Sequence, residues 1–241
     1  MSPNEILFRA VQNQKLFGQI NRQLLKTIVA GHYKAGDLLP PERDHADMFG
    51  VSRVVVREAL GSLRDKGIVS IKQGRGTTVN PIDEWNTLDP EVLMLLYGDE
   101  LYEKLIQLRG IIEPEFAALA AENITPEELE KLRKVSDLPE SDTVEQHVER
   151  DTMYHLLIAK ATHNPVLLIV LSSISEMLRE SRRRTFAVHG ELAKARYWHK
   201  TIFEAIEAHI PQAAREAMSA HMQQVQNGLE RFNRLNQEDH N

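Results

Sequence analysis

Cysteine is absent from the 241 residues of this chain. Its absence excludes disulfide bonds and thiol catalysis, and it removes the usual ligands of zinc fingers, so any bound metal must be held by histidine, aspartate or glutamate. The chain also lacks any run approaching the roughly 20 apolar residues that a membrane-spanning helix needs, and its N-terminus has no signal-peptide pattern. We therefore expect a soluble, cytoplasmic protein that does not associate with a membrane.

Strand signals are missing after Pro90, where the chain shows no alternation of apolar and polar residues. Helical periodicity takes their place, interrupted by prolines and by acidic first turns. Seven predicted helices in this part of the chain indicate a compact antiparallel all-α bundle and a mostly α fold. They cover residues 91–97, 101–123, 126–135, 144–162, 165–188, 191–210 and 211–235.

The net charge of −6 is unevenly distributed. Residues 1–80 hold 12 Lys and Arg against 7 Asp and Glu, a formal charge of +5, and residues 81–241 hold 17 against 28, a charge of −11. A basic N-terminal part can release counterions from DNA, whereas an acidic remainder is repelled by phosphates. Two Asx-Pro breakers separate the halves. We therefore predict a DNA-binding domain over residues 1–80, a linker over 81–90 and a helical domain over 91–241.

The stretch Leu39–Val79 has the pattern of a winged helix-turn-helix. After a helix predicted over residues 4–30, with a break around Gly18, it predicts a short helix, a tight turn at residues 49–51 and a second helix. Ser52 is a good N-cap for the second helix, because its hydroxyl can accept a hydrogen bond from a backbone N–H of the first turn. One face of that helix is apolar, and its residues are Val55, Ala59, Leu60 and Leu63.

A two-stranded wing is predicted after Gly67, which ends the second helix. Residues 68–71 are rich in β-branched side chains, and a second short strand returns at residues 77–79. The hairpin turns at Gly74-Arg75-Gly76. An arginine between two glycines at a hairpin tip is well placed to contact the minor groove or a phosphate of DNA.

This window closely resembles the GntR family of bacterial transcription regulators. The family's N-terminal domain reads LPSER, then an FGVSR-like turn, VREAL and a G-x-G wing, and this chain has LPPER at 39–43, FGVSR at 49–53, VREAL at 56–60 and GRG at 74–76. Val54 stands where the family often has a threonine that contacts DNA. The resemblance implies that double-stranded operator DNA is contacted by Arg43, Ser52, Arg53, Arg57, Gly74 and Arg75.

A possible metal site lies in the predicted helical domain. Asp151 and His155 are spaced i, i+4 and share one helix face. His199 and His221 stand 11 and 10 residues on either side of the break at Ile210-Pro211, so a helical hairpin would bring them to the same height. One carboxylate and three imidazoles suit Zn, Ni, Mn or Fe. The alternative is a structural hydrogen bond between Asp151 and His155 with no metal.

The second half resembles the FadR subfamily of the GntR family, whose helical FCD domain carries an Asp-x-x-x-His and two later histidines on its last two long helices. The resemblance implies that Asp151, His155, His199 and His221 hold a divalent metal ion and that the domain binds a small carboxylate effector. FCD domains also have an arginine near Arg109, which implies that its guanidinium grips that carboxylate.

The sequence leaves two possible roles for Arg109 and for the arginines at residues 179–184. The alternative for Arg109 is an ion pair with the glutamate four residues further on. The basic stretch that contains Arg179 and residues 182–184 is predicted to be a solvated helix end, with a further effector contact as its alternative.

Together these patterns predict a metabolite-responsive transcription repressor. Two winged heads of a homodimer would read the halves of a palindrome, and the helical domain would bind a small organic or sugar acid on its metal. One alternative is a metal-dependent enzyme acting on a carboxylate, since an open metal site activates water, although no general base or nucleophile motif accompanies the ligands. Another is a metal-free regulator of an acyl ligand, against which the intact Asp and three His argue.

Overall fold

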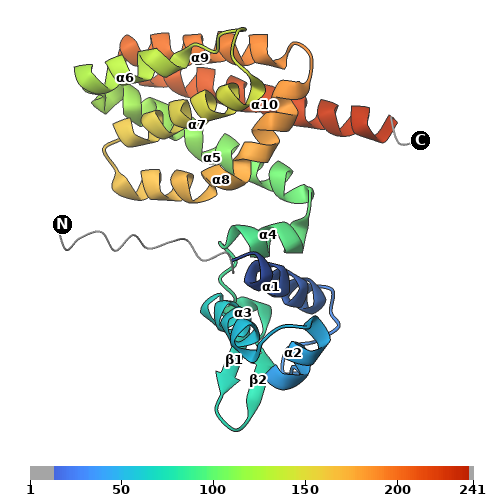
Figure 1. Ribbon diagram of the computed structural model, residues 1–241. Helices are drawn as coiled ribbons and strands as arrows, with labels where there is room; N and C mark the ends of the chain where they lie inside the picture. The colour runs from blue at the N-terminus through green and yellow to red at the C-terminus, as the bar shows by residue number, and fades with distance from the viewer. Residues whose placement is uncertain (1–13, 239–241) are drawn as a thin grey trace, which may run out of the picture. The chain divides into compact units, whose positions relative to one another are not determined.

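A computed structural model describes residues 14–238 of the chain (Figure 1). Its contacts divide the chain into two compact units, and the division falls between Gly98 and Asp99. The helix predicted over residues 4–30 is present as α1 (Gln14–Val29), which continues through Gly18, so the predicted break is wrong. Residues 4–13 lie outside the described part of the chain. No helix among the described residues is long and apolar enough to cross a membrane.

The first unit contains the predicted helix-turn-helix. Helix α2 (Glu42–Phe49) ends at Gly50, whose φ of 65° is left-handed, and α3 (Arg53–Asp65) follows. Ser52 caps α3 as predicted, because its Oγ accepts a hydrogen bond from the backbone N–H of Val55 over 3.5 Å. We predicted Val55 in the apolar face, but Val55 is only half-buried. The buried residues of α3 are Val56, Ala59, Leu60 and Leu63.

The wing is an antiparallel pair of short strands, β1 (Val69–Lys72) and β2 (Gly76–Val79). Lys72 pairs with Gly76, so the hairpin turn consists of residues 73–75 and presents Gly74 and Arg75 at its tip. An isolated bridge between Leu38 and Thr78 ties the segment before α2 to the wing. This confirms the predicted winged architecture.

The stretch predicted as a linker is folded onto the first unit. It contains a 3₁₀ helix, η1 (Ile82–Glu84), and is followed by α4 (Pro90–Tyr97), which the contacts also assign to the first unit. The Lys66 ammonium at the end of α3 lies 3.0 Å from Asp89 Oδ1 and 2.8 Å from Glu91 Oε2. Trp85 packs against the apolar core of the unit. These contacts explain why α4, which we placed at the start of the second domain, groups with the first unit instead.

The second unit is a helical bundle. Within the described residues it has six α-helices rather than the predicted seven, because α4 belongs to the first unit. Capping boxes at Thr125 and Thr143 and the N-cap Asn164 begin three of these helices where the sequence predicts them. The helices are α5 (Glu100–Asn123), α6 (Pro126–Ser136), α7 (Val144–Ala161), α8 (Pro165–Ala187), α9 (Glu191–Glu207) and α10 (Pro211–Glu238).

Helix α5 is the central element of this bundle. It packs against α7, α8, α9 and α10, and α10 in turn packs against α8 and α9. Buried residues are therefore distributed around much of the α5 surface rather than along one stripe. Through α5 this packing gathers α7, α9 and α10 around one central helix (Figure 1).

Candidate metal centre

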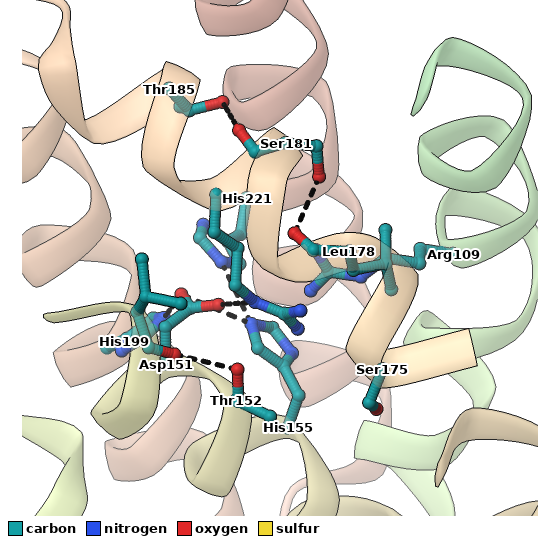
Figure 2. A network of polar contacts seen from close by, with 12 residues as sticks. Arg109, Asp151, Thr152, His155, Ser175, Leu178, Ser181, Thr185, His199 and His221 are labelled. Carbon is teal, nitrogen blue, oxygen red and sulfur yellow. Dashed lines mark hydrogen bonds and ion pairs between the residues drawn. The ribbon is translucent and has the colours of Figure 1, made fainter. Parts of the chain in front are cut away.

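Asp151 and His155 of α7, His199 of α9 and His221 of α10 converge in the interior of the second unit (Figure 2). All four side chains are buried, and one potential ligand atom from each lies within 4.8 Å of the other three. The i, i+4 spacing on α7 places two of them on one face, and the turn between α9 and α10 brings the other two opposite. The structure therefore brings together the four residues that the sequence singles out.

Distances inside the cluster fit a single metal ion. His155 Nε2 lies 3.4 Å from His221 Nε2 and 3.7 Å from Asp151 Oδ1, and His199 Nε2 lies 3.2 Å from the same Oδ1. An ion bound tetrahedrally with bonds of 2.0–2.2 Å would hold its ligand atoms about 3.3–3.6 Å apart. His199 is fully buried, yet within residues 14–238 neither of its ring nitrogens makes a hydrogen bond. An ion bound at Nε2 would account for one of these two unpaired nitrogens.

The ionisation of the cluster also suits a cation. Burial by itself raises the pKa of Asp151, but the charges of His155 and Arg182 outweigh burial and hold that pKa well below its ordinary value. Burial lowers the pKa of His199, and burial together with the neighbouring imidazoles holds the pKa of His221 well below its ordinary value. An ionised carboxylate and neutral imidazoles are the forms that bind metal.

Arg182 of α8 lies against the cluster. Its Nε donates to Asp151 Oδ2, which leaves Oδ1 facing the histidines. The side chain is only 3% exposed, and its Nη1 and Nη2 find no hydrogen-bond partner among the described residues. Arg182 also lines a small cavity of about 10 Å³, whose lining residues are Arg109, Asp151, Arg182, Thr185, Phe186, Ala195, His221, Gln224 and Val225.

The burial of Arg182 differs from the solvated helix end that we predicted for this basic stretch. Arg183, one residue along, fits that prediction better, because its side chain is 42% exposed and pairs with Glu145 and Glu180. The signal for Arg182 was its spacing from Leu178 and Thr185, which are both buried on α8. Residues at i, i+4 and i+7 share one helix face, so Arg182 had to point inward with its neighbours on that face.

Arg109 of α5 is buried and lines the same cavity. Its Nε and Nη2 donate to the two carboxylate oxygens of Glu113, which is the ion pair left open as an alternative. Glu113 also lies 2.5 Å from the Nδ1 of His155. Arg109 is therefore joined through Glu113 to the histidine cluster, and sequence spacing alone did not place Glu113 beside His155.

The six residues expected at DNA are all exposed in the first unit. Arg43 lies on α2, and α3 begins with Arg53 after its cap at Ser52. Arg57, one turn further along α3, is held by Glu42 of α2, with its Nη2 2.8 Å from Glu42 Oε2. Helix α3 packs against both α2 and β1, which fixes the helix beside the wing. The tip of that wing carries Gly74 and Arg75.

Comparison with protein families finds two matches that together cover most of the chain. The family "Bacterial regulatory proteins, gntR family" matches residues 16–79, and the family "FCD domain" matches residues 104–224. The first match covers the winged helix-turn-helix. The second covers most of the helical bundle and includes all four residues of the candidate metal site.

Several curated proteins are similar along most of their length. The galactonate operon transcriptional repressor of Escherichia coli K12 is 31% identical over 80% of this chain and 87% of its own. The Uxu operon transcriptional regulator of the same organism is 31% identical over 94% of this chain and 91% of its own. The HTH-type transcriptional regulator LutR of Bacillus subtilis is 32% identical over 83% and 94%.

Solved structures share the fold at lower identity. A GntR family member from Pseudomonas syringae has a TM-score of 0.51 and 20% identity, covering 94% of this chain and 89% of its own. A solved structure of Lar from Listeria monocytogenes has a TM-score of 0.59 and 19% identity to this chain. It covers 93% of this chain and 99% of its own. At these identities the likeness concerns the fold alone.

Proposed function

Because this chain belongs to the GntR family of bacterial transcription regulators and carries an FCD domain, we propose that it is a repressor that senses a small organic or sugar acid through a metal centre. Members of this family are DNA-binding transcription regulators. The alternative that this chain is a metal-dependent enzyme is therefore rejected. The observation that supports the sensing proposal is the buried cluster of one aspartate and three histidines beside the unpaired guanidinium of Arg182.

Asp151, His155, His199 and His221 would hold the divalent ion, with zinc, nickel, manganese and iron all compatible with this donor set. Four protein ligands leave further coordination positions on an ion that prefers five or six, and a carboxylate or hydroxyl oxygen of an effector can fill them. The structure favours no single metal among these, because nitrogen and oxygen donors at this spacing suit each of them.

The effector's carboxylate would pair with Nη1 and Nη2 of Arg182, which form the edge of a guanidinium that binds carboxylates through two parallel hydrogen bonds. Arg109 lines the same cavity and adds positive charge there, although Glu113 already occupies part of its guanidinium. A relative named for the galactonate operon supports an acid of this class. An acyl ligand without metal is the less favoured alternative, because its chain would need an apolar cavity rather than one bordered by two arginines and Asp151.

Operator recognition would follow the pattern of winged helix-turn-helix proteins. Helix α3 would enter the major groove and the wing would touch the adjacent backbone or minor groove. The residues we assign to DNA contact are Arg43, Ser52, Arg53, Arg57, Gly74 and Arg75. Two copies in a homodimer would read a palindrome, and the effector would change operator affinity only through its different affinity for the two states of the dimer.

Metal analysis and operator release together test this function. The protein is purified without chelator or affinity tag, and about one metal ion per chain is expected, with none retained by the Asp151→Ala/His155→Ala variant. Duplexes selected by the protein from random sequence then serve as operator in an anisotropy titration with a panel of hydroxy acids and sugar acids. At least one acid should weaken operator binding ten-fold or more, with metal-loaded protein only.

Two outcomes contradict the proposal. Operator release by an acid that is equally effective on the metal-free variant would remove the metal from the sensing mechanism. A wild-type protein that contains no metal and is released by an acyl compound would favour the acyl-ligand regulator instead.

A further inference from the structure

Two imidazoles of the proposed metal site also contact residues that are not ligands, through the nitrogen that faces away from the site. His155 and His221 face each other through their Nε2 atoms (Figure 2). The opposite nitrogen of each ring lies near an oxygen outside the cluster. His155 Nδ1 lies 2.5 Å from Glu113 Oε2, at ion-pair distance but without the angle of a full hydrogen bond. His221 Nδ1 lies 3.2 Å from Gln224 Oε1. The Nδ1 atom of each ring therefore has its own neighbour: Glu113 of α5 beside His155 and Gln224 of α10 beside His221.

Glu113 lies behind His155 and forms an ion pair with Arg109. Its side chain is buried, with 1% exposed. Arg109 fixes the orientation of the carboxylate by donating from Nε and Nη2 to its two oxygens. A carboxylate offers only acceptors, so the His155 nitrogen that faces it must carry the proton.

Gln224 behind His221 is oriented by the next residue outward. Its Nε2 donates to Glu191 Oε2 over 2.9 Å, and Glu191 Oε1 accepts from Lys194 Nζ over 2.8 Å. Because the Glu191 carboxylate can only accept, it must meet the NH₂ end of the amide, which leaves the carbonyl end toward His221. His221 therefore also presents Nδ1–H outward.

We propose that Glu113 and Gln224 are positioning residues of the metal centre, which hold His155 and His221 as Nδ1–H tautomers so that both rings direct the lone pair of Nε2 at the ion. The assignment rests on the proposed metal site. It gives the buried Arg109–Glu113 pair a role, because the pair supports a ligand from outside the coordination sphere. His199 is oriented differently, by stacking on Tyr154 with ring centroids 4.1 Å apart and an interplanar angle of 14°.

Cobalt binding tests the assignment on the full-length protein. Co²⁺ affinity is measured at fixed pH by competition with a chromophoric chelator, and the visible absorption bands of bound Co²⁺ report its coordination geometry. Glu113→Gln and Gln224→Met should each bind Co²⁺ about 10- to 100-fold more weakly than wild type and should shift those bands. Glu115→Gln is the matched control, because Glu115 lies on the same helix but is exposed and pairs with Arg215. It should keep the wild-type affinity and spectrum.

The two variants control for a possible loss of folding in either one. Glu113→Gln leaves Arg109 facing a neutral amide and can impair folding, whereas Gln224→Met removes no charge. Circular dichroism of the metal-free proteins identifies the variants that are folded. Folded variants with wild-type Co²⁺ affinity and an unchanged spectrum would overturn the proposal while leaving the metal site intact. A wild-type protein that binds no Co²⁺ would instead remove the metal site itself.

Discussion

Arg182 is buried with only part of its guanidinium paired. Its Nε is engaged with Asp151, while Nη1 and Nη2 find no partner in the described part of the chain. A buried N–H without an acceptor costs about 1–3 kcal/mol, more for a charged group, so folding alone does not explain the arrangement. A carboxylate that arrives in the cavity would satisfy both nitrogens.

Replacing Arg182 with Met should therefore weaken effector binding by about 2–5 kcal/mol, because the charged carboxylate loses its hydrogen-bonded partner in a buried site. The measurement is calorimetric titration of metal-saturated protein with the acid that releases the operator. Arg183→Met is the control, since Arg183 lies next to it on α8 but is paired with surface glutamates, and its effector affinity should not change. Equal affinities for the two variants would show that Arg182 does not bind the effector.

Helix α3 is the element that we propose recognises the operator. Its buried residues anchor it in the first unit, and its arginines are exposed. Arg57 is also oriented before DNA binds, because Glu42 accepts from its Nε and Nη2 and leaves the other edge of the guanidinium toward solvent. A free guanidinium edge can donate two hydrogen bonds to a guanine.

We expect Arg57→Ala to reduce operator affinity by about 1–3 kcal/mol and to relax the base preference at one position of each half-site. Anisotropy titrations at matched salt, with the selected operator and single-base variants of it, measure both effects. Arg64→Ala serves for comparison, because Arg64 lies in the last turn of the same helix and pairs with Asp65. Unchanged affinity in Arg57→Ala would argue against the assignment of α3 as the recognition helix.

The junction after α3 requires glycine for two reasons. Gly67 has a φ of +72°, and a Cβ at this position would lie 2.3 Å from the backbone oxygen of Glu84. Backbone atoms of η1 cannot move aside as a flexible side chain would. The glycine thus allows η1 and the following stretch to fold closely against the end of α3.

Gly67→Ala should destabilise the first unit by about 1–3 kcal/mol or more, from backbone strain and from the clash with η1. Gly61→Ala should have the opposite sign, a gain of about 0.5–1 kcal/mol, because Gly61 is inside α3 and a Cβ there meets no described atom within 4 Å. Urea unfolding followed by circular dichroism measures both. A stable Gly67→Ala variant would contradict the described contact with η1.

At the scale of the whole molecule, two units share one chain and each has its own core. The proposed metal site belongs to the second unit, so a bound ion would stabilise that unit by mass action. Cores of two separate units can unfold in separate transitions, which a single melting temperature would hide.

Chelation should therefore lower one of two calorimetric transitions. An ion present at 100 times its dissociation constant contributes about 2.7 kcal/mol, which is lost when the metal is removed. Differential scanning calorimetry with and without chelator makes the measurement, and the Asp151→Ala/His155→Ala variant should not respond. A thermogram that is identical before and after chelation would contradict metal binding by this cluster.

The sequence by itself determined the features that depend on neighbouring residues along the chain. Ser52, Thr125 and Asn164 begin helices because a side-chain oxygen satisfies a backbone N–H two or three residues further on. The spacing of Asp151 and His155 placed both on one helix face for the same local reason. The family resemblance of both halves was also readable from these motifs, and the comparisons confirm it.

Only the tertiary structure decided which faces meet. It buried Arg182 beside Asp151, set Glu113 behind His155 and kept α4 with the first unit. These contacts join residues distant in sequence, and spacing along a single helix carries no information about the helix packed against it. Buried charges are specified in the same way, because an arginine or glutamate can enter a protein interior only where another element supplies its partner.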